Sequence, residues 1–203
     1  MIQRVSWKAG KPIWSLILIL LLVLVYLPSI FGGYLIYDDP VLITENVILQ
    51  QPGIETLKKI LFDFSYKTRL TLGAEYLPVR DLTHWVELQL FGLNAQLMRI
   101  NQLFVYGVAV LLFRSALLRA LGVGIVAEVA AWAFAFHPVH PESVAWLAGR
   151  KDVLALFFVA LALFLYAGKG RRVLLAVPLV LSAAVFSKSM SVAAVALLPA
   201  MDL

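Results

Sequence analysis

Long apolar runs separated by short polar turns make up most of this sequence. The first run, residues 12–31, has 20 residues and no charged side chain. As an α-helix it would reach roughly 30 Å, the thickness of a bilayer's hydrocarbon core. It is longer than a signal-peptide core, and the Ser-Ile-Phe-Gly-Gly that ends it is a poor cleavage site. We therefore predict a first membrane helix over 12–31 rather than a removed signal peptide.

A long segment of mixed polarity follows, over residues 32–98. Prolines and glycines punctuate it, and helical patterns are plausible around 54–64 and 82–90. It reads as one large loop with short helices lying at the membrane surface.

Apolar runs then return to the end of the chain, so residues 99–203 are predicted to form further membrane helices. They resume after Ile100, Val123, Val153, Val173 and Val192. The expected fold is an all-α, polytopic membrane protein with about six helices. Residues 1–203 would form a single membrane domain, and only 15 residues follow Lys188. We therefore expect the domain to be part of a larger one.

The runs 124–136 and 153–167 are short for complete spans. The stretch between them is predicted to lie partly at membrane depth. Charged, non-helical backbone is tolerated there only where it lines a protein-enclosed or watery cavity.

Charge sets the expected orientation. Eight of the 12 acidic residues lie between Asp38 and Glu87, in the large loop. Cations without acids fall in the segments predicted on the opposite side: Arg4, Lys8, Lys11, Arg114, Arg119, Lys169, Arg171 and Arg172. The positive-inside rule then predicts residues 1–11 as a cytoplasmic tail. The large loop and the stretch 136–152 would share the outer, periplasmic or luminal face.

Composition excludes several classes of protein. A mean hydropathy of +0.91 with 14% charged residues lies far from ordinary soluble domains. The chain has no cysteine, which excludes disulfides and thiolate metal sites. The net charge of +5 would fit nucleic acid only if the cations shared one aqueous face, which the topology does not predict. Membrane lipids are the expected surroundings.

Two polar stretches carry candidate chemistry. Asp38 and Asp39 follow the first helix, where repulsion between adjacent carboxylates favours a usable base, although a solvated turn has the same pattern. His137, His140 and Glu142 could be metal ligands, but Pro138 and Pro141 prevent both histidines from sharing one helical face. A structural or substrate-binding turn is the better interpretation, and no metal site is predicted.

Cations next to these stretches could bind a phosphate. Arg150 and Lys151 would meet a lipid phosphate at the outer surface, or else form local pairs with Asp152. Arg80, next to Asp81, precedes an amphipathic segment. Glu128 lies within an apolar run, where an ionisable group is functional unless it has a bonding partner.

Four stretches in register resemble membrane glycosyltransferases of the GT-C class, particularly the transmembrane and tetratricopeptide-repeat O-mannosyltransferases and their bacterial relatives. They are HPVHPESVAWLAGRKDVLALFF (137–158), YDDPVLITENVIL (37–49), the passage 76–113 beginning YLPVRD, and FSKSMSVAAVALLPAMDL (186–203). Phe91 stands where the family has tryptophan, and Ser189 where it usually has glutamate. The resemblance covers the N-terminal part of the family's membrane domain.

The resemblance implies transfer of a sugar from a polyprenyl phosphate to a hydroxyl of a protein or glycan, with mannose inherited from the family alone. Asp38, or Asp39, would be the base, and Arg150, Lys151, Arg80 and Lys188 would bind the donor phosphate. His137, His140, Glu142 and Asp152 would line the substrate pocket. No cofactor is implied, and the question of a divalent metal stays open. The alternatives are an inactive relative that binds polyprenyl lipid or acts as a scaffold, a transporter, and a metal hydrolase.

Overall fold

A computed structural model describes residues 12–122, 124–168 and 173–200. Every regular element among these residues is a helix. The α-helices are α1 (Pro12–Ile30), α2 (Ile54–Phe62), α3 (Tyr66–Thr71), α4 (Pro78–Phe91), α5 (Ala95–Leu121), α6 (Gly124–Ala135), α7 (His140–Ala145), α8 (Arg150–Ala167), α9 (Val173–Ser187) and α10 (Leu197–Ala200). Three further segments are helices of other types: the π-helix η1 (Pro40–Thr44) and the 3₁₀-helices η2 (Leu147–Gly149) and η3 (Ser189–Ala196).

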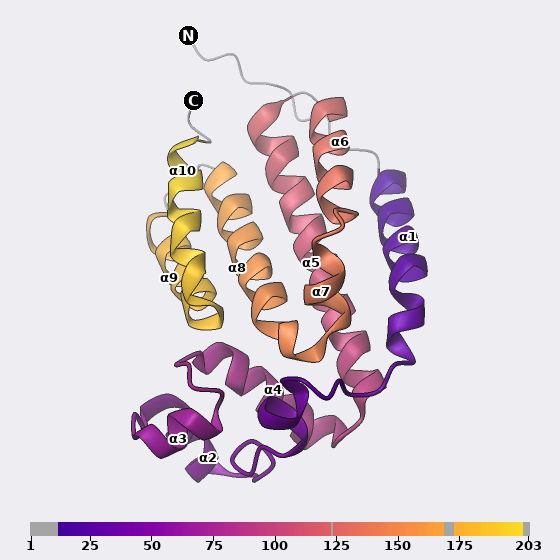
Figure 1. The fold of residues 1–203 in the computed structure, drawn as a ribbon. Coiled ribbons are helices and arrows are strands. Elements are labelled where there is room, and N and C mark those ends of the chain that lie inside the picture. Colours follow the sequence, from indigo (N-terminus) through magenta and orange to yellow (C-terminus); the bar gives the residue numbers. More distant parts are fainter. Residues whose placement is uncertain (1–11, 123, 169–172, 201–203) are drawn as a thin grey trace.

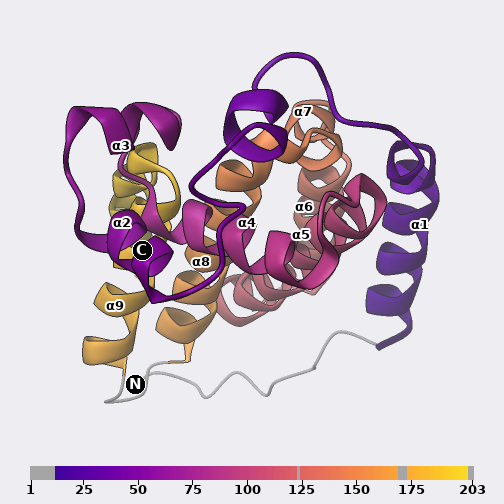
Figure 2. The same ribbon diagram turned by 90° about the horizontal axis from the view of Figure 1, so that it is seen from below.

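The long helices stand side by side as a bundle, with a lobe of short helices at one end (Figure 1). α5 is central: it packs against α8, α6 and α1, and α8 packs in turn against α9. Seen from the lobe end, α2, α3 and α4 lie across the bundle (Figure 2). The lobe belongs to residues 32–94, so the large loop predicted from the sequence is a folded unit.

α1 shows why an apolar helix occupies the edge of the bundle. Leu18, Leu22 and Tyr26 recur every four residues and are buried against α5, where Tyr26 and Tyr106 meet edge to face at 5.9 Å. Most of the other apolar side chains of α1 are exposed. In an aqueous protein such a surface would be unusual, whereas a lipid-facing helix requires it.

Two described helices are long and apolar enough to cross a membrane, α1 and α5. Three further apolar helical stretches are shorter: Gly124–Ala135, Leu175–Ser187 and Ser189–Pro199. The all-helical expectation is confirmed for the described residues. The expectation of about six membrane helices stays a prediction, and its N-terminal tail and the cations Lys169, Arg171 and Arg172 lie outside those residues.

The lobe is held together by polar side chains as much as by its small apolar core. The Asn46 amide donates to the carbonyl oxygens of Val41 (3.0 Å) and Thr71 (2.8 Å), and its oxygen accepts from the N–H groups of Ile48 and Leu49. One buried side chain thus satisfies four backbone groups of irregular segments. The apolar core of the lobe includes Leu147 and Ala148, so the lobe and the α7–α8 junction share a core at the same end of the bundle.

Candidate functional site

The acidic pair at the start of the lobe divides into one buried and one exposed carboxylate. Asp39 is fully buried: Oδ2 accepts from the N–H of Leu35 at 2.8 Å, and Oδ1 from the N–H of Ala148 at 3.0 Å. Asp38 is exposed. Asp39 therefore ties the loop after α1 to η2, and Asp38 is the member of the pair whose carboxylate faces solvent.

The Tyr37 ring lies beside Trp146, with ring centroids 6.0 Å apart. Together with the Asp39–Ala148 bond, this contact places Asp38 and Asp39, the acidic motif, against residues 136–152, the His-Pro stretch. The two stretches singled out from the sequence, 109 residues apart at that bond, therefore meet at one end of the bundle.

Gln102 of α5 holds the irregular backbone of the His-Pro stretch. Its Nε2 donates to the carbonyl oxygens of Ser143 (2.7 Å), Val144 (3.2 Å) and Trp146 (2.7 Å). These carbonyls lie at and just beyond the end of α7, where intrahelical donors run out. A side-chain amide buried within a bundle helix supplies the missing donors.

Arg99, one turn earlier on α5, also donates to backbone carbonyl groups, and these belong to three different segments. Its guanidinium donates to the carbonyl oxygens of Ser29 (3.1 Å), Gly33 and Ala145. The end of α1, the turn that follows it and the end of α7 are therefore gathered around one buried cation.

Arg150 was expected to bind phosphate at a surface. It is the first residue of α8 and is fully buried. Its Nη1 donates to Oε1 of Glu87 (2.8 Å), Nε to Oε1 of Gln102 (2.9 Å) and Nη2 to the Met98 carbonyl (3.1 Å). The guanidinium is thereby occupied by protein groups. This position differs from the expected one because α4 and α5 supply a carboxylate and two oxygens that the local sequence does not contain.

Arg80 is also buried, in a cluster that reaches the surface through Glu75. Arg80 donates from Nε to Oδ1 of Asp81 (2.8 Å) and from Nη2 to the Leu72 carbonyl (2.5 Å), and Nη1 is 3.3 Å from Glu75 Oε2. The same Glu75 oxygen accepts from Lys151 Nζ at 3.0 Å. Glu75 and Lys151 are 44% and 31% exposed, so Lys151 is the accessible cation of this cluster.

Asp81 should make the stability of the lobe depend on pH. Burial raises the pKa of Asp81 to about 6 despite the neighbouring Arg80, and its Oδ2 has no hydrogen-bond partner. Because the folded-state pKa is raised, the folded protein holds this proton more tightly than the unfolded chain does. The resulting stability is fully present below the pKa of the unfolded state and is lost as pH rises through about 6. From pH 4 to 7 we expect the free energy of unfolding to fall by up to about 3 kcal/mol through this group.

The test is thermal unfolding of the purified protein across that pH range, beside Asp81→Asn. In the Asp81→Asn variant, the fall in the free energy of unfolding with rising pH should disappear. Asp63→Asn is the control, since bonds from Thr68 and Ser65 hold the pKa of Asp63 at about 2, below the range tested. An Asp81→Asn profile parallel to that of the parent would contradict the prediction.

Lys188 and Asp152 form another partly exposed ion pair near Lys151. Lys188 follows the end of α9, and its ammonium contacts the carboxylate of Asp152 in the first turn of α8. The two side chains are 37% and 27% exposed. Lys151 and Asp152 are neighbours, so the Lys151–Glu75 and Lys188–Asp152 pairs both lie at the start of α8.

The three residues of the His-Pro stretch have different surroundings. His137 and Glu142 are exposed, whereas His140 is half-buried. The His140 ring packs 4.7 Å from Phe134 and 5.5 Å from Tyr106, between centroids. Burial and the neighbouring His137 lower the pKa of His140, which favours its neutral form at physiological pH.

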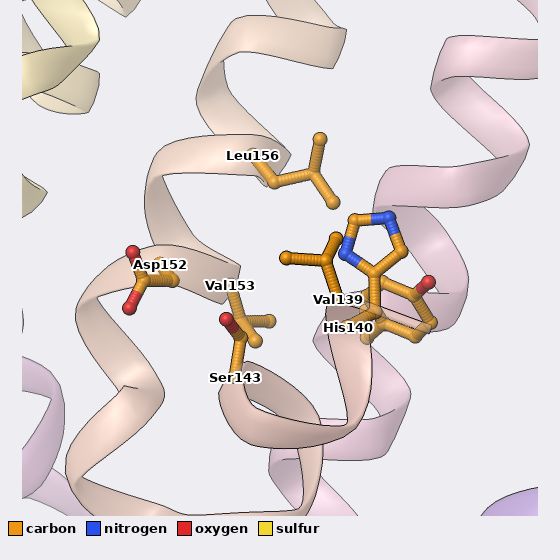
Figure 3. A pocket seen from close by; sticks show the side chains of 7 residues that line it. Val139, His140, Ser143, Asp152, Val153 and Leu156 are labelled. Atoms are coloured by element: carbon orange, nitrogen blue, oxygen red, sulfur yellow. The ribbon is translucent and has the colours of Figure 1, made fainter. Parts of the chain in front are cut away.

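A cavity of about 230 Å³ lies between α7 and α8 (Figure 3). The His140 imidazole and the Asp152 carboxylate are on opposite sides of it, with Ser143 between them. The remaining wall is formed by Tyr106, Val139, Val153 and Leu156. Gly149 allows α7 to come this close to α8, because a Cβ there would meet the Ser143 carbonyl oxygen at 2.8 Å. Among the predicted pocket residues, His140 and Asp152 line this cavity, and His137 and Glu142 do not.

Glu128, the acid expected to be functional within an apolar run, has a structural partner. It accepts from Nε of Arg114 at 2.7 Å and contacts Nη2 of the same residue, whose Nη1 reaches Ser15 at 3.0 Å. The pair joins α6, α5 and α1 at the end of the bundle away from the lobe. Neither residue belongs to the candidate site.

Sequence reasoning missed the residues that position the site: Glu75, Glu87, Arg99 and Gln102. A signal existed for the last two, since a cation and an amide one turn apart on an apolar helix must find partners. Within the described ranges, no group of three or more His, Asp or Glu side chains is arranged to hold a metal ion.

Comparison with known proteins gives one informative similarity. No family model and no solved structure matches the chain. A protein O-mannosyl-transferase, F38B6.6 of Caenorhabditis elegans, is 30% identical over 156 residues, which are 74% of this chain. The matched region is 22% of the length of that relative. The similarity supports a glycosyltransferase-like relationship for this chain and, with the two apolar helices, association with a membrane.

Proposed function

We propose that this chain transfers a sugar from a polyprenyl-phosphate donor to a hydroxyl acceptor at the outer face of a membrane. One observation carries the proposal: the acidic motif and the His-Pro stretch converge at one end of the bundle, with Asp39 bonded to the Ala148 N–H and Asp38 exposed beside it. The similarity to an O-mannosyl-transferase gives the reaction class.

Asp38 is the proposed general base, because Asp39 has both carboxylate oxygens committed to backbone N–H groups. The Asp38 carboxylate takes the proton of the acceptor hydroxyl as its oxygen bonds to the anomeric carbon. The bond from that carbon to the phosphate oxygen breaks, and the polyprenyl phosphate leaves with the electron pair. A base positioned in this way contributes roughly 10²–10⁴-fold to rate.

Negative charge develops on the departing phosphate and calls for nearby cations. Lys151 and Lys188 are the proposed ligands, since each is partly exposed and pairs with a carboxylate at the start of α8. Arg150 and Arg80 are assigned a positioning role, because their donors already bond to protein oxygens.

In the proposed membrane orientation, the lobe lies on the outer side and the N-terminus lies in the cytoplasm. The described cations Arg114 and Arg119 lie in the half of α5 away from the lobe, as the positive-inside rule requires. The donor is a polyprenyl-phosphate sugar, mannose being the first candidate, and the acceptor is a protein or glycan hydroxyl.

The test is transfer of radiolabelled mannose from polyprenyl-phosphate mannose in membranes that contain the parent chain or Asp38→Asn. We expect at least a 100-fold loss of transfer in the variant. Glu55→Gln is the matched control, because Glu55 is exposed on α2, where it pairs with Lys58. An Asp38→Asn variant as active as the parent would rule out the assigned base.

A second arm addresses the alternative function. If the folded, inserted parent chain transfers no mannose, donors carrying other sugars are tested in the same membranes. A chain inactive with all of them but retaining polyprenyl phosphate would be a lipid-binding relative, and the proposed function would be wrong.

A further inference from the structure

The cavity between α7 and α8 is small, partly polar and close to electrical neutrality. At about 230 Å³ it is below the roughly 300–1,000 Å³ of sites for drug-sized ligands, so one small ring fills it. The charge of Asp152 is balanced by Lys188, and His140 is favoured in its neutral form. A phosphate group would therefore meet no uncompensated cation among the residues that line the cavity.

The polar groups of the cavity suit hydroxyl groups. A carboxylate can accept two hydrogen bonds from neighbouring hydroxyls, a serine hydroxyl both donates and accepts, and a neutral imidazole offers one donor and one acceptor. Three of the residues that line the cavity, Asp152, Ser143 and His140, carry these groups. Val139, Val153 and Leu156 add apolar surface to the same lining, against which the C–H face of a ring can pack.

We propose that this cavity binds one uncharged monosaccharide ring, with Asp152, Ser143 and His140 hydrogen-bonded to its hydroxyls. The inference rests on the proposed function in taking that ring to be the sugar that the chain transfers. It goes further in assigning the sugar to a particular cavity and in separating that cavity from the phosphate ligand Lys151. Lys188 connects the two assignments, since it pairs with Asp152 and is also a proposed phosphate ligand.

The chain contains three histidines, which makes sugar binding directly observable. In nanodiscs, where no sugar-based detergent competes, isotope-labelled imidazoles give one set of NMR signals each for His84, His137 and His140. Loss of one set in His140→Gln assigns it. Methyl α-mannoside and methyl α-glucoside are the probes, and inorganic phosphate is the anion arm.

We expect a methyl glycoside to shift the His140 signals saturably and to leave those of the buried His84 unchanged. Asp152→Asn should weaken the apparent affinity at least tenfold and Ser143→Ala several-fold, while Glu55→Gln leaves it unchanged. Two substitutions on different helices keep the test sharp if one of them unfolds the protein. Shifts by phosphate alone, or no saturable shift with either glycoside, would overturn the inference.

The Asp38→Asn variant separates this inference from the proposed function, because Asp38 is not among the residues lining the cavity. It should lose transfer and keep the glycoside-dependent shift of His140. Sugar binding without transfer by the parent chain would leave the cavity assignment standing and contradict the proposed reaction. Sugar transfer without any glycoside-dependent shift of the His140 signals would support the proposed reaction and contradict the cavity assignment.

Discussion

Arg150→Met is expected to lower the free energy of unfolding by about 3–5 kcal/mol, the usual cost of breaking a buried ion pair by removing one partner. The variant removes the guanidinium partner of the buried Glu87 carboxylate, which keeps the Asn101 amide at 2.5 Å and lies 3.9 Å from the His84 imidazole. It also leaves the Gln102 side-chain oxygen and the Met98 carbonyl without their donor. Chemical unfolding of the purified protein, followed by tryptophan fluorescence, measures the change.

Lys151→Met is the matched control for this prediction. It removes a cation from the adjacent position, but its pair with Glu75 is partly exposed, where ion pairs contribute at most about 1 kcal/mol. The double variant Glu87→Leu, Arg150→Met should recover much of the lost stability, since an apolar pair of similar volume can replace a buried ion pair. Equal effects of the Arg150 and Lys151 substitutions would contradict the burial described for Arg150.

Asp39→Asn is expected to cost roughly 2–4 kcal/mol, because two hydrogen bonds to a charged group are affected. An amide can accept with one oxygen, but its NH₂ group would then face the second backbone N–H. The N–H groups of Leu35 and Ala148 cannot both keep their acceptor. Hydrogen exchange at Ala148 reports the change locally, and it should accelerate by more than an order of magnitude.

Asp38→Asn provides the comparison, since it makes the same chemical change at the neighbouring, exposed position. It should leave the exchange of Ala148 and the melting temperature unchanged. The adjacent carboxylates would then be separated experimentally into one that positions the loop and one that is free to take a proton. Similar losses of stability in both variants would be incompatible with the different surroundings described for them.

The helix α1 shows what the linear pattern could predict. Its apolar run predicted a helix over 12–31, and the structure has Pro12–Ile30. The interruption at 136–149 was also visible, because prolines and charged residues cannot continue an apolar helix there. The expected helices in the loop overlap α2 and α4. The loop and the His-Pro stretch were expected to share the outer face; they share a core at one end of the bundle, and the side of the membrane stays a prediction.

Arg150 and Lys188 show where the pattern stops being informative. The partner of Arg150 is Glu87, 63 residues earlier, and nothing local marks that pairing. The apolar run after Lys188 has the composition of a membrane helix, yet it begins as the 3₁₀ segment Ser189–Ala196. Nor could spacing distinguish Asp38 from Asp39, since their difference comes from the N–H of Ala148, contributed by a distant turn.

The Asp39–Ala148 bond also has a consequence for the order in which the protein matures during synthesis. Asp39 is added to the nascent chain 109 residues before Ala148, and all of α5 and α6 are synthesised in between. Until then the carboxylate has only the Leu35 N–H from within its own segment. The loop can therefore make this contact only after α5 and α6 have been synthesised, and a nascent chain arrested before residue 148 would lack the second donor to Asp39.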